Sequence, residues 1–168
     1  NVDFYIPDRY AEGYGVSYQG IDHAQAEGCA LIISLDCGIR SVEHVAYAKS
    51  KNIDFIVCDH HNPGNELPDC LVLDPKRKDC AYPYKELSGC GVGFKLLQGL
   101  VQINEWNLHE LYEQLDLLAV SIGADIVPVT GENRVLCYFG MQHLNAKPRK
   151  AFQELLLVAK RSFPLSLT

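Results

Sequence analysis

The chain has 168 residues, of which 48% are hydrophobic and 21% are charged, with a net charge of −6 and a pI near 5.4. This balance excludes a disordered chain and fits one domain of ordinary size with a buried core. No apolar run approaches the roughly 18 residues of a membrane span. The acidic net charge argues against electrostatic binding of nucleic acid over the whole protein surface. We expect a cytosolic protein.

The first half of the chain alternates predicted strands with predicted helices. Residues 2–6 predict a short strand, and Ser17 is a candidate N-cap for the helix that follows. Ser41 is a candidate N-cap for a second helix. Continuous apolar runs predict strands buried on both faces at residues 29–35, 53–58 and 70–75. Strands that alternate with helices across short loops are typical of a parallel sheet with covering helices.

The second half of the chain has a helical pattern. Helices are predicted at residues 89–101, 108–122, 132–144 and 149–160. The predicted fold class is therefore α/β, with an open, mainly parallel sheet flanked by helices and followed by a helical section.

Polar side chains follow two of the predicted strands directly. The stretch "SLDCG" places Asp36 after the first strand, and "CDHHNPG" places Asp59, His60 and His61 after the next. Because ligands bind at the carboxyl ends of parallel strands, we expect these side chains to share one edge of the sheet. A third acid, Asp125 in "GADIVPVTGENR", lies where a helix gives way to an extended segment.

Carboxylates mixed with imidazole suit Mn²⁺ or Mg²⁺ better than structural zinc. Two such ions roughly 3.5–4 Å apart can activate water and stabilise phosphoryl oxygens, so the pattern indicates phosphoester hydrolysis. Plainer alternatives stay open. Asp36 alone is typical of a turn or cap residue, Asp125 can bond to backbone amides, and a pair of histidines can arise by chance.

The seven cysteines include no Cys-x-x-Cys pair, and their odd, scattered set indicates no disulfide framework. Several lie within apolar stretches, which favours buried reduced thiols. A zinc site formed by Cys37, Cys58 and His60 is the alternative.

In chain order, "SLDCGI", "CDHHNPG" and "GADIVPVTGENR" resemble the second, third and fourth motifs of the DHH phosphoesterase superfamily, named for Asp-His-His. The stretches "YIPDRYAEGYGVS" and "SGCGVGFKLLQGL" resemble the RecJ-type single-stranded-DNA-specific exonucleases within it. The resemblance runs from Tyr5 to about Arg134. It implies a DHH-type fold and metal-dependent hydrolysis of single-stranded DNA, from the five-prime to the three-prime end, in repair and recombination.

The resemblance also implies a role for each residue that matches a motif. Asp36 would bridge two Mn²⁺ or Mg²⁺ ions, and His60 and Asp125 would ligate one of them. Asp59 would orient its neighbours without binding the metal, as oriented imidazole ligands require. His61 would face the scissile phosphate and help to neutralise charge in the transition state.

Arg9 in "IPDR" would reach the terminus of the DNA, because a planar guanidinium suits a terminal phosphate. A surface salt bridge is the alternative for Arg9. Single-stranded DNA is the implied substrate, and a single-stranded-DNA-binding protein or a helicase is the candidate protein partner.

Two parts of the resembled exonucleases have no match in the chain, namely the aspartate-rich first motif and the C-terminal substrate-binding domain. We therefore expect residues 1–145 to form a DHH-type catalytic domain that lacks its first motif. Residues 146–168 are expected to begin the helix that leads to the C-terminal domain. Because Met141 is the only methionine, we expect a piece of a longer protein, with a processed mature chain as the alternative.

Two other functions remain as alternatives. The first is a DHH-type phosphodiesterase that acts on short oligonucleotides, cyclic dinucleotides or pyrophosphate. The second is a non-catalytic scaffold with the same fold. The presence of Asp36, His60, His61 and Asp125 disfavours the scaffold, since such relatives have lost these ligands.

Overall fold

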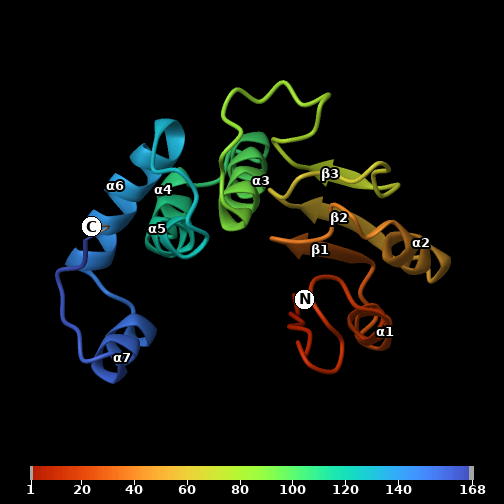
Figure 1. Cartoon of the computed structure of the whole chain (residues 1–168), viewed down its shortest axis with the longest axis horizontal. Helices are drawn as coiled ribbons and strands as arrows, with labels where there is room; N and C mark the ends of the chain where they lie inside the picture. The colour runs from red at the N-terminus through yellow and green to blue at the C-terminus, as the bar shows by residue number, and fades with distance from the viewer. Residues whose placement is uncertain (1, 167–168) are drawn as a thin grey trace. The chain divides into compact units, whose positions relative to one another are not determined.

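Figure 1 shows the computed structural model, which describes residues 2–166. The chain divides into two compact units, the first ending at Lys85 and the second beginning at Glu86. Within the described residues, no helix combines the length and the apolarity needed to cross a membrane. The expected division into residues 1–145 and 146–168 stays a prediction.

The first unit is built on a three-stranded parallel sheet. Strands β1 (Leu31–Leu35), β2 (Asp54–Cys58) and β3 (Leu71–Leu73) pair in that order, and their arrows point the same way in Figure 1. Helices α1 (Tyr18–Ala26) and α2 (Val42–Ser50) lie on one side of the sheet. This arrangement confirms the predicted α/β class with an open parallel sheet.

The core of the first unit lies between the sheet and these two helices. Its buried residues are Ile21, Ala24, Ile39, Val45, Ala48, Ile53, Phe55, Val57 and Val72. The expected burial of both faces is wrong for β1, because Leu31, Ile33 and Leu35 are 44%, 44% and 58% exposed. Alternate side chains of a strand point to opposite faces, and within this unit α1 and α2 cover only one of them.

The strand predicted at residues 2–6 is wrong, because this segment is part of a loop that precedes α1. Its apolar side chains are exposed, namely Val2, Phe4 and Ile6. A strand needs a neighbour for its backbone hydrogen bonds, and none of the described strands pairs with this segment.

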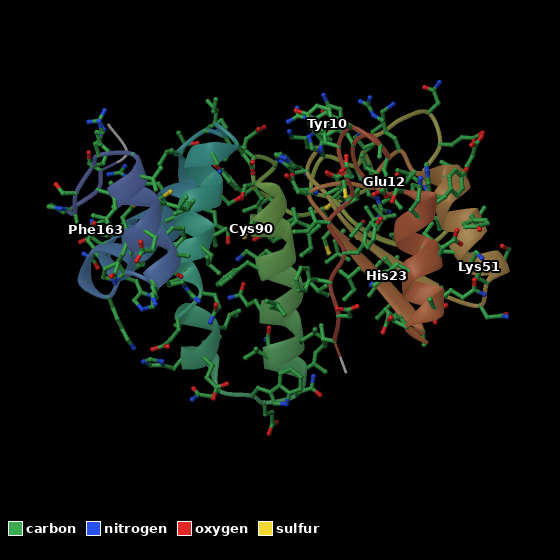
Figure 2. All side chains as sticks on the ribbon, turned by 90° about the horizontal axis from the view of Figure 1, so that it is seen from below. Tyr10, Glu12, His23, Lys51, Cys90 and Phe163 are labelled. Atoms are coloured by element: carbon green, nitrogen blue, oxygen red, sulfur yellow. The ribbon has the colours of Figure 1, made fainter. Side chains whose placement is uncertain are left out.

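Glu12 organises this loop instead, and Figure 2 labels its position. Its carboxylate accepts hydrogen bonds from the Tyr5 hydroxyl at 2.8 Å, the Asp8 N–H at 2.8 Å and the Ser17 hydroxyl at 2.6 Å. The Ser17 oxygen accepts the N–H of Gly20 at 3.0 Å, which confirms the predicted N-cap of α1. Local polar contacts therefore connect the loop to the start of the helix.

The second unit is helical, as predicted. Its helices are α3 (Gly89–Ile103), α4 (Leu108–Tyr112), α5 (Leu115–Ala124), α6 (Gly131–Ala146) and α7 (Lys150–Val158). Helix α5 packs against α3 and α6, as Figure 1 shows. The buried core comprises Phe94, Leu111, Leu118, Ala119, Ile122 and Cys137.

The single helix predicted over residues 108–122 is instead two helices, α4 and α5. The break falls at residues 113–114, just before Asp116 in the first turn of α5. Asp116 is 1% exposed and accepts hydrogen bonds from Arg149 Nε at 2.5 Å and Nη2 at 3.0 Å. Arg149 also donates to the carbonyl oxygen of Glu113, between the two helices, at 3.0 Å. Burial opposes ionisation of Asp116, but the hydrogen bond from Arg149 helps to lower its pKa.

Arg149→Met is expected to lower the free energy of unfolding by about 2–3 kcal/mol, because it leaves the Asp116 carboxylate buried without its partner. The expected value is below that of a fully buried pair, since the Arg149 side chain is 39% exposed. Urea denaturation followed by circular dichroism measures it. Lys49→Met is the control, because it removes an exposed ion pair with Asp69 worth about 1 kcal/mol or less. Equal losses in the two variants would contradict the prediction.

Candidate metal centre

The carboxyl ends of β1 and β2 bring three of the predicted site residues together. Leu35 pairs with Cys58 at the end of the two strands. The N–H of the next residue, Asp36, donates to the Cys58 carbonyl oxygen at 2.9 Å. Nε2 of His60 lies 3.0 Å from Oδ1 of Asp36. Asp36, His60 and His61 can each offer one ligand atom, with all three atoms within 4.8 Å of one another. The expected meeting of these residues is observed, and their roles as ligands stay predictions.

A tight turn after β1 aims the Asp36 carboxylate at this site. Asp36 itself has φ 63°, a left-handed conformation that aspartate tolerates better than most residues. Gly38 has φ 109°, and a Cβ atom there would lie 2.6 Å from Oγ of Ser34. That hydroxyl donates to the Cys37 carbonyl oxygen at 2.9 Å and so closes the turn. The Asp36 side chain stays 49% exposed, which leaves its oxygens accessible to a cation.

Asp59 is buried beneath the two histidines, with 1% exposure. Its Oδ2 accepts the Ile39 N–H at 2.9 Å, and its Oδ1 accepts the His60 N–H at 2.7 Å and lies 2.7 Å from Nδ1 of His61. Burial opposes ionisation of Asp59, but these hydrogen bonds outweigh it and lower its pKa. Both carboxylate oxygens are therefore engaged, an arrangement that suits a positioning residue better than a metal ligand.

Asp125 lies in the second unit, at the C-cap of α5. Its Oδ2 is 3.3 Å from Oγ of Ser121, which is 3.1 Å from Oγ of Ser88. The next residue, Ile126, has φ 54°, an uncommon conformation for a β-branched side chain. Such strain is often found at functional sites. The convergence of Asp125 on Asp36 and His60 stays a prediction.

Arg9 lies in the loop before α1, with its guanidinium carbon 4.2 Å from the centre of the Tyr14 ring. Within residues 2–166 it forms no ion pair, so the alternative of a surface salt bridge finds no support. The flat face of the guanidinium stacks on the aromatic ring, and this contact holds the charged group in place. The predicted contact of Arg9 with a DNA terminus is untested.

The cysteines are free thiols, as expected, and none of those within residues 2–166 joins the cluster of candidate ligands. Burial, with a contribution from the Asp59 charge, raises the pKa of Cys37 and of Cys58 to about 11. Among residues 2–166, Cys37 and Cys58 do not form a group of potential metal ligands with His60. The alternative zinc site is not supported.

Sequence reasoning missed Asp74, which directly follows β3. Leu73 pairs with Cys58, and the N–H of Asp59 donates to the Leu73 carbonyl oxygen at 3.0 Å. Asp74 therefore lies beside Asp59 at the same edge of the sheet. The sequence did contain a pattern that indicates Asp74, because an aspartate directly follows the apolar residues of each of the three predicted strands.

A comparison with protein families matches residues 1–122 to the DHH family, N-terminal domain. The chain belongs to the DHH family. The carboxyl edge of its sheet thus carries the Asp-His-His sequence for which the family is named, at residues 59–61.

Two relatives of this DHH chain share one name, single-stranded-DNA-specific exonuclease RecJ. The chain is 43% identical to the Bacillus subtilis (strain 168) protein over 157 residues, which cover 92% of the chain and 19% of that protein. It is 39% identical to the Escherichia coli (strain K12) protein over 172 residues, which cover 96% of the chain and 30% of that protein. The DHH chain therefore spans less than a third of the length of these relatives.

Solved structures show the same fold as this DHH chain. An exonuclease RecJ bound to manganese superposes with a TM-score of 0.79 at 32% identity, covering 92% of this chain and 39% of that one. RecJ from Thermus thermophilus in complex with Mn²⁺ superposes with a TM-score of 0.72 at 28% identity, covering 86% of this chain and 22% of that one.

The residues of the DHH site fit a divalent cation on chemical grounds. A half-exposed carboxylate and an imidazole lie at hydrogen-bond distance, and a second imidazole is oriented by a buried acid. Oxygen and imidazole donors without thiolates suit Mn²⁺ and Mg²⁺. The carboxylate of Asp36 offers two oxygens, as a ligand shared between two ions requires.

Proposed function

We propose that the chain is part of the catalytic core of a metal-dependent exonuclease that degrades single-stranded DNA from the five-prime end, in repair and recombination. The cluster of Asp36, His60 and His61 at the carboxyl edge of a DHH sheet is the observation that carries this proposal. The names of the relatives support the substrate, and the manganese in the solved relatives supports the metal.

In this proposal Asp36, His60 and Asp125 would hold Mn²⁺ or Mg²⁺, and Asp36 would serve both of the two ions bound by the intact protein. The bound ions would activate water and neutralise charge on the phosphoryl oxygens. His60 serves as a ligand through Nε2, the ring nitrogen that faces Asp36. That nitrogen must offer its lone pair to a cation, so the ring proton would then be on Nδ1.

Asp59 and His61 act together on the scissile phosphate in this proposal. The Asp59 carboxylate holds Nδ1 of His61, so Nε2 is the ring nitrogen left for the substrate. An N–H at Nε2 could donate a hydrogen bond to a phosphoryl oxygen and so help to stabilise the charge of the transition state. Arg9, placed against Tyr14, binds the terminal phosphate of the DNA.

The chain covers only a small part of the length of its relatives. This supports the proposal that it is a catalytic region within a longer protein. We propose that residues 1–145 belong to its DHH-type domain, that residues 146–168 lead toward a C-terminal domain, and that the first motif lies elsewhere in the protein. The chain alone then binds at most one ion weakly and is inactive. Protein partners of the intact cytosolic enzyme would include a single-stranded-DNA-binding protein or a helicase.

The test is the degradation of five-prime-labelled single-stranded DNA by the intact protein that contains this chain. We expect release of the label as a mononucleotide, dependent on Mn²⁺ or Mg²⁺ and abolished by chelation. A blunt duplex of the same sequence is the control and is expected to resist. Faster hydrolysis of dinucleotides or cyclic dinucleotides than of long strands would favour the other DHH phosphodiesterases. No Mn²⁺ binding by calorimetry would favour a scaffold.

A further inference from the structure

Each of the three strands of the sheet in the first unit is followed directly by an aspartate. Asp36 follows β1, Asp59 follows β2 and Asp74 follows β3. The parallel register places Asp74 next to Asp59, on the side of Asp59 away from β1. Neighbouring strands are about 4.8 Å apart, so Asp74 belongs to the same carboxyl edge as the candidate metal ligands.

The Asp74 side chain is buried and only partly satisfied. It is 3% exposed, and its Oδ1 accepts the Lys76 N–H at 2.7 Å. Its Oδ2 is buried without a hydrogen-bond partner. Burial raises the pKa of Asp74, and the neighbouring Asp59 charge raises it further, whereas His60 is close enough to act in the opposite direction. A buried acceptor without a donor is unfavourable, and one at a candidate site requires an explanation.

Metal binding would create a need for such an acceptor. Nε2 of His60 lies 3.0 Å from Oδ1 of Asp36. At this distance a proton on Nε2 can form a hydrogen bond with the Asp36 carboxylate. A cation at that position needs the Nε2 lone pair, so the remaining ring proton must be on Nδ1. Ligating histidines generally donate this second N–H to a carboxylate, a carbonyl or water, which fixes the ring.

Of the three aspartates, only Asp74 has an oxygen for this purpose. Both oxygens of Asp59 already accept hydrogen bonds, from the N–H groups of Ile39 and His60 among others. Asp36 faces the opposite ring nitrogen of His60. Asp74 combines a position at the same edge with a buried and unpaired oxygen.

We propose that Asp74 is a positioning residue of the metal centre, whose Oδ2 accepts the Nδ1–H hydrogen bond of His60 when Nε2 of that ring binds a divalent cation. This inference rests on the proposed metal-binding function. It assigns a donor to a buried oxygen that otherwise has no hydrogen-bond partner.

The experiment measures Mn²⁺ affinity by calorimetry on the intact protein, together with the unfolding temperature with and without Mn²⁺. Asp74→Ala is expected to bind Mn²⁺ about 10–100-fold more weakly, the usual effect of losing the partner of a ligating histidine. Asp74→Asn keeps one carbonyl oxygen and is expected to restore part of this loss. Because Asp74→Ala also removes the Oδ1 acceptor of the Lys76 N–H, the deciding quantity is the Mn²⁺-induced rise in unfolding temperature, which is expected to be smaller in this variant than in the parent.

Asp69→Ala is the matched control, because it removes a carboxylate before the opposite end of β3, where the side chain is 96% exposed. Equal Mn²⁺ affinities of Asp74→Ala and Asp69→Ala would overturn the proposal. So would a lower metal-free unfolding temperature of Asp74→Ala with an unchanged Mn²⁺-induced rise, which indicates a purely structural role. Asp36→Ala is measured alongside. If it also binds Mn²⁺ normally, the proposed function fails, whereas normal binding by Asp74→Ala alone overturns only the role of Asp74.

Discussion

Asp36→Ala in the intact protein is expected to lower metal-dependent degradation of single-stranded DNA by about 10³-fold or more. The carboxylate is the exposed anionic donor of the cluster, and a metal ion supplies several kcal/mol of charge stabilisation to phosphoryl transfer, with each 1.36 kcal/mol worth a factor of ten. The rate of nucleotide release at saturating Mn²⁺ measures the effect. Weaker Mn²⁺ binding is expected in the same variant, because alanine offers no ligand.

Asp54→Ala is the control for this change, since Asp54 is an exposed aspartate at the beginning of β2, at the opposite edge of the sheet. It is expected to retain the activity of the parent protein. The stability of Asp36→Ala is expected to fall by no more than about 1 kcal/mol. Alanine tolerates the left-handed turn less well than aspartate, but the site is half exposed and the turn is also held by Ser34. Retention of activity within about tenfold of the parent would contradict the role of Asp36, since loss of a group acting on the transition state typically exceeds that factor.

Asp59→Ala is expected to lower the free energy of unfolding by about 3–5 kcal/mol, the largest effect on stability that we predict. The carboxylate is 1% exposed and accepts the backbone N–H groups of Ile39, His60 and His61. Alanine leaves these donors without their acceptor and opens a cavity. Urea denaturation at neutral pH measures the loss, and Asp79→Ala, which removes a 65% exposed carboxylate, is expected to lose less than about 1 kcal/mol.

The effect of Asp59→Ala is expected to depend on pH in a defined direction. The folded-state pKa of Asp59 lies below its unfolded value, so its stabilising contribution is fully present above the unfolded value near pH 4. That contribution is lost as the pH falls through the folded-state pKa. The difference in stability between the parent and the variant should therefore shrink in acid. If this difference in stability grows as the pH falls, the ionised carboxylate is not the group that stabilises the fold.

Local features of this fold were predictable because they depend on residues close together in the chain. The apolar runs that form β1, β2 and β3 and the cap at Ser17 were found from composition and spacing. Predictions failed where a distant residue decides the outcome. The helix over residues 108–122 breaks where Arg149, far along the chain, binds Asp116 and the Glu113 carbonyl oxygen.

The sequence by itself determined the parallel α/β class, the DHH motifs and the set of candidate ligands, because these follow from periodicity, from short motifs and from strand-end residues that a parallel sheet gathers at one edge. Only the tertiary structure decided which oxygens at that edge have partners. Asp59 is saturated by N–H groups of its own loop and of Ile39, while Oδ2 of Asp74 has none. Hydrogen bonds depend on distances of a few tenths of an ångström, and those distances exist only once the strands are paired.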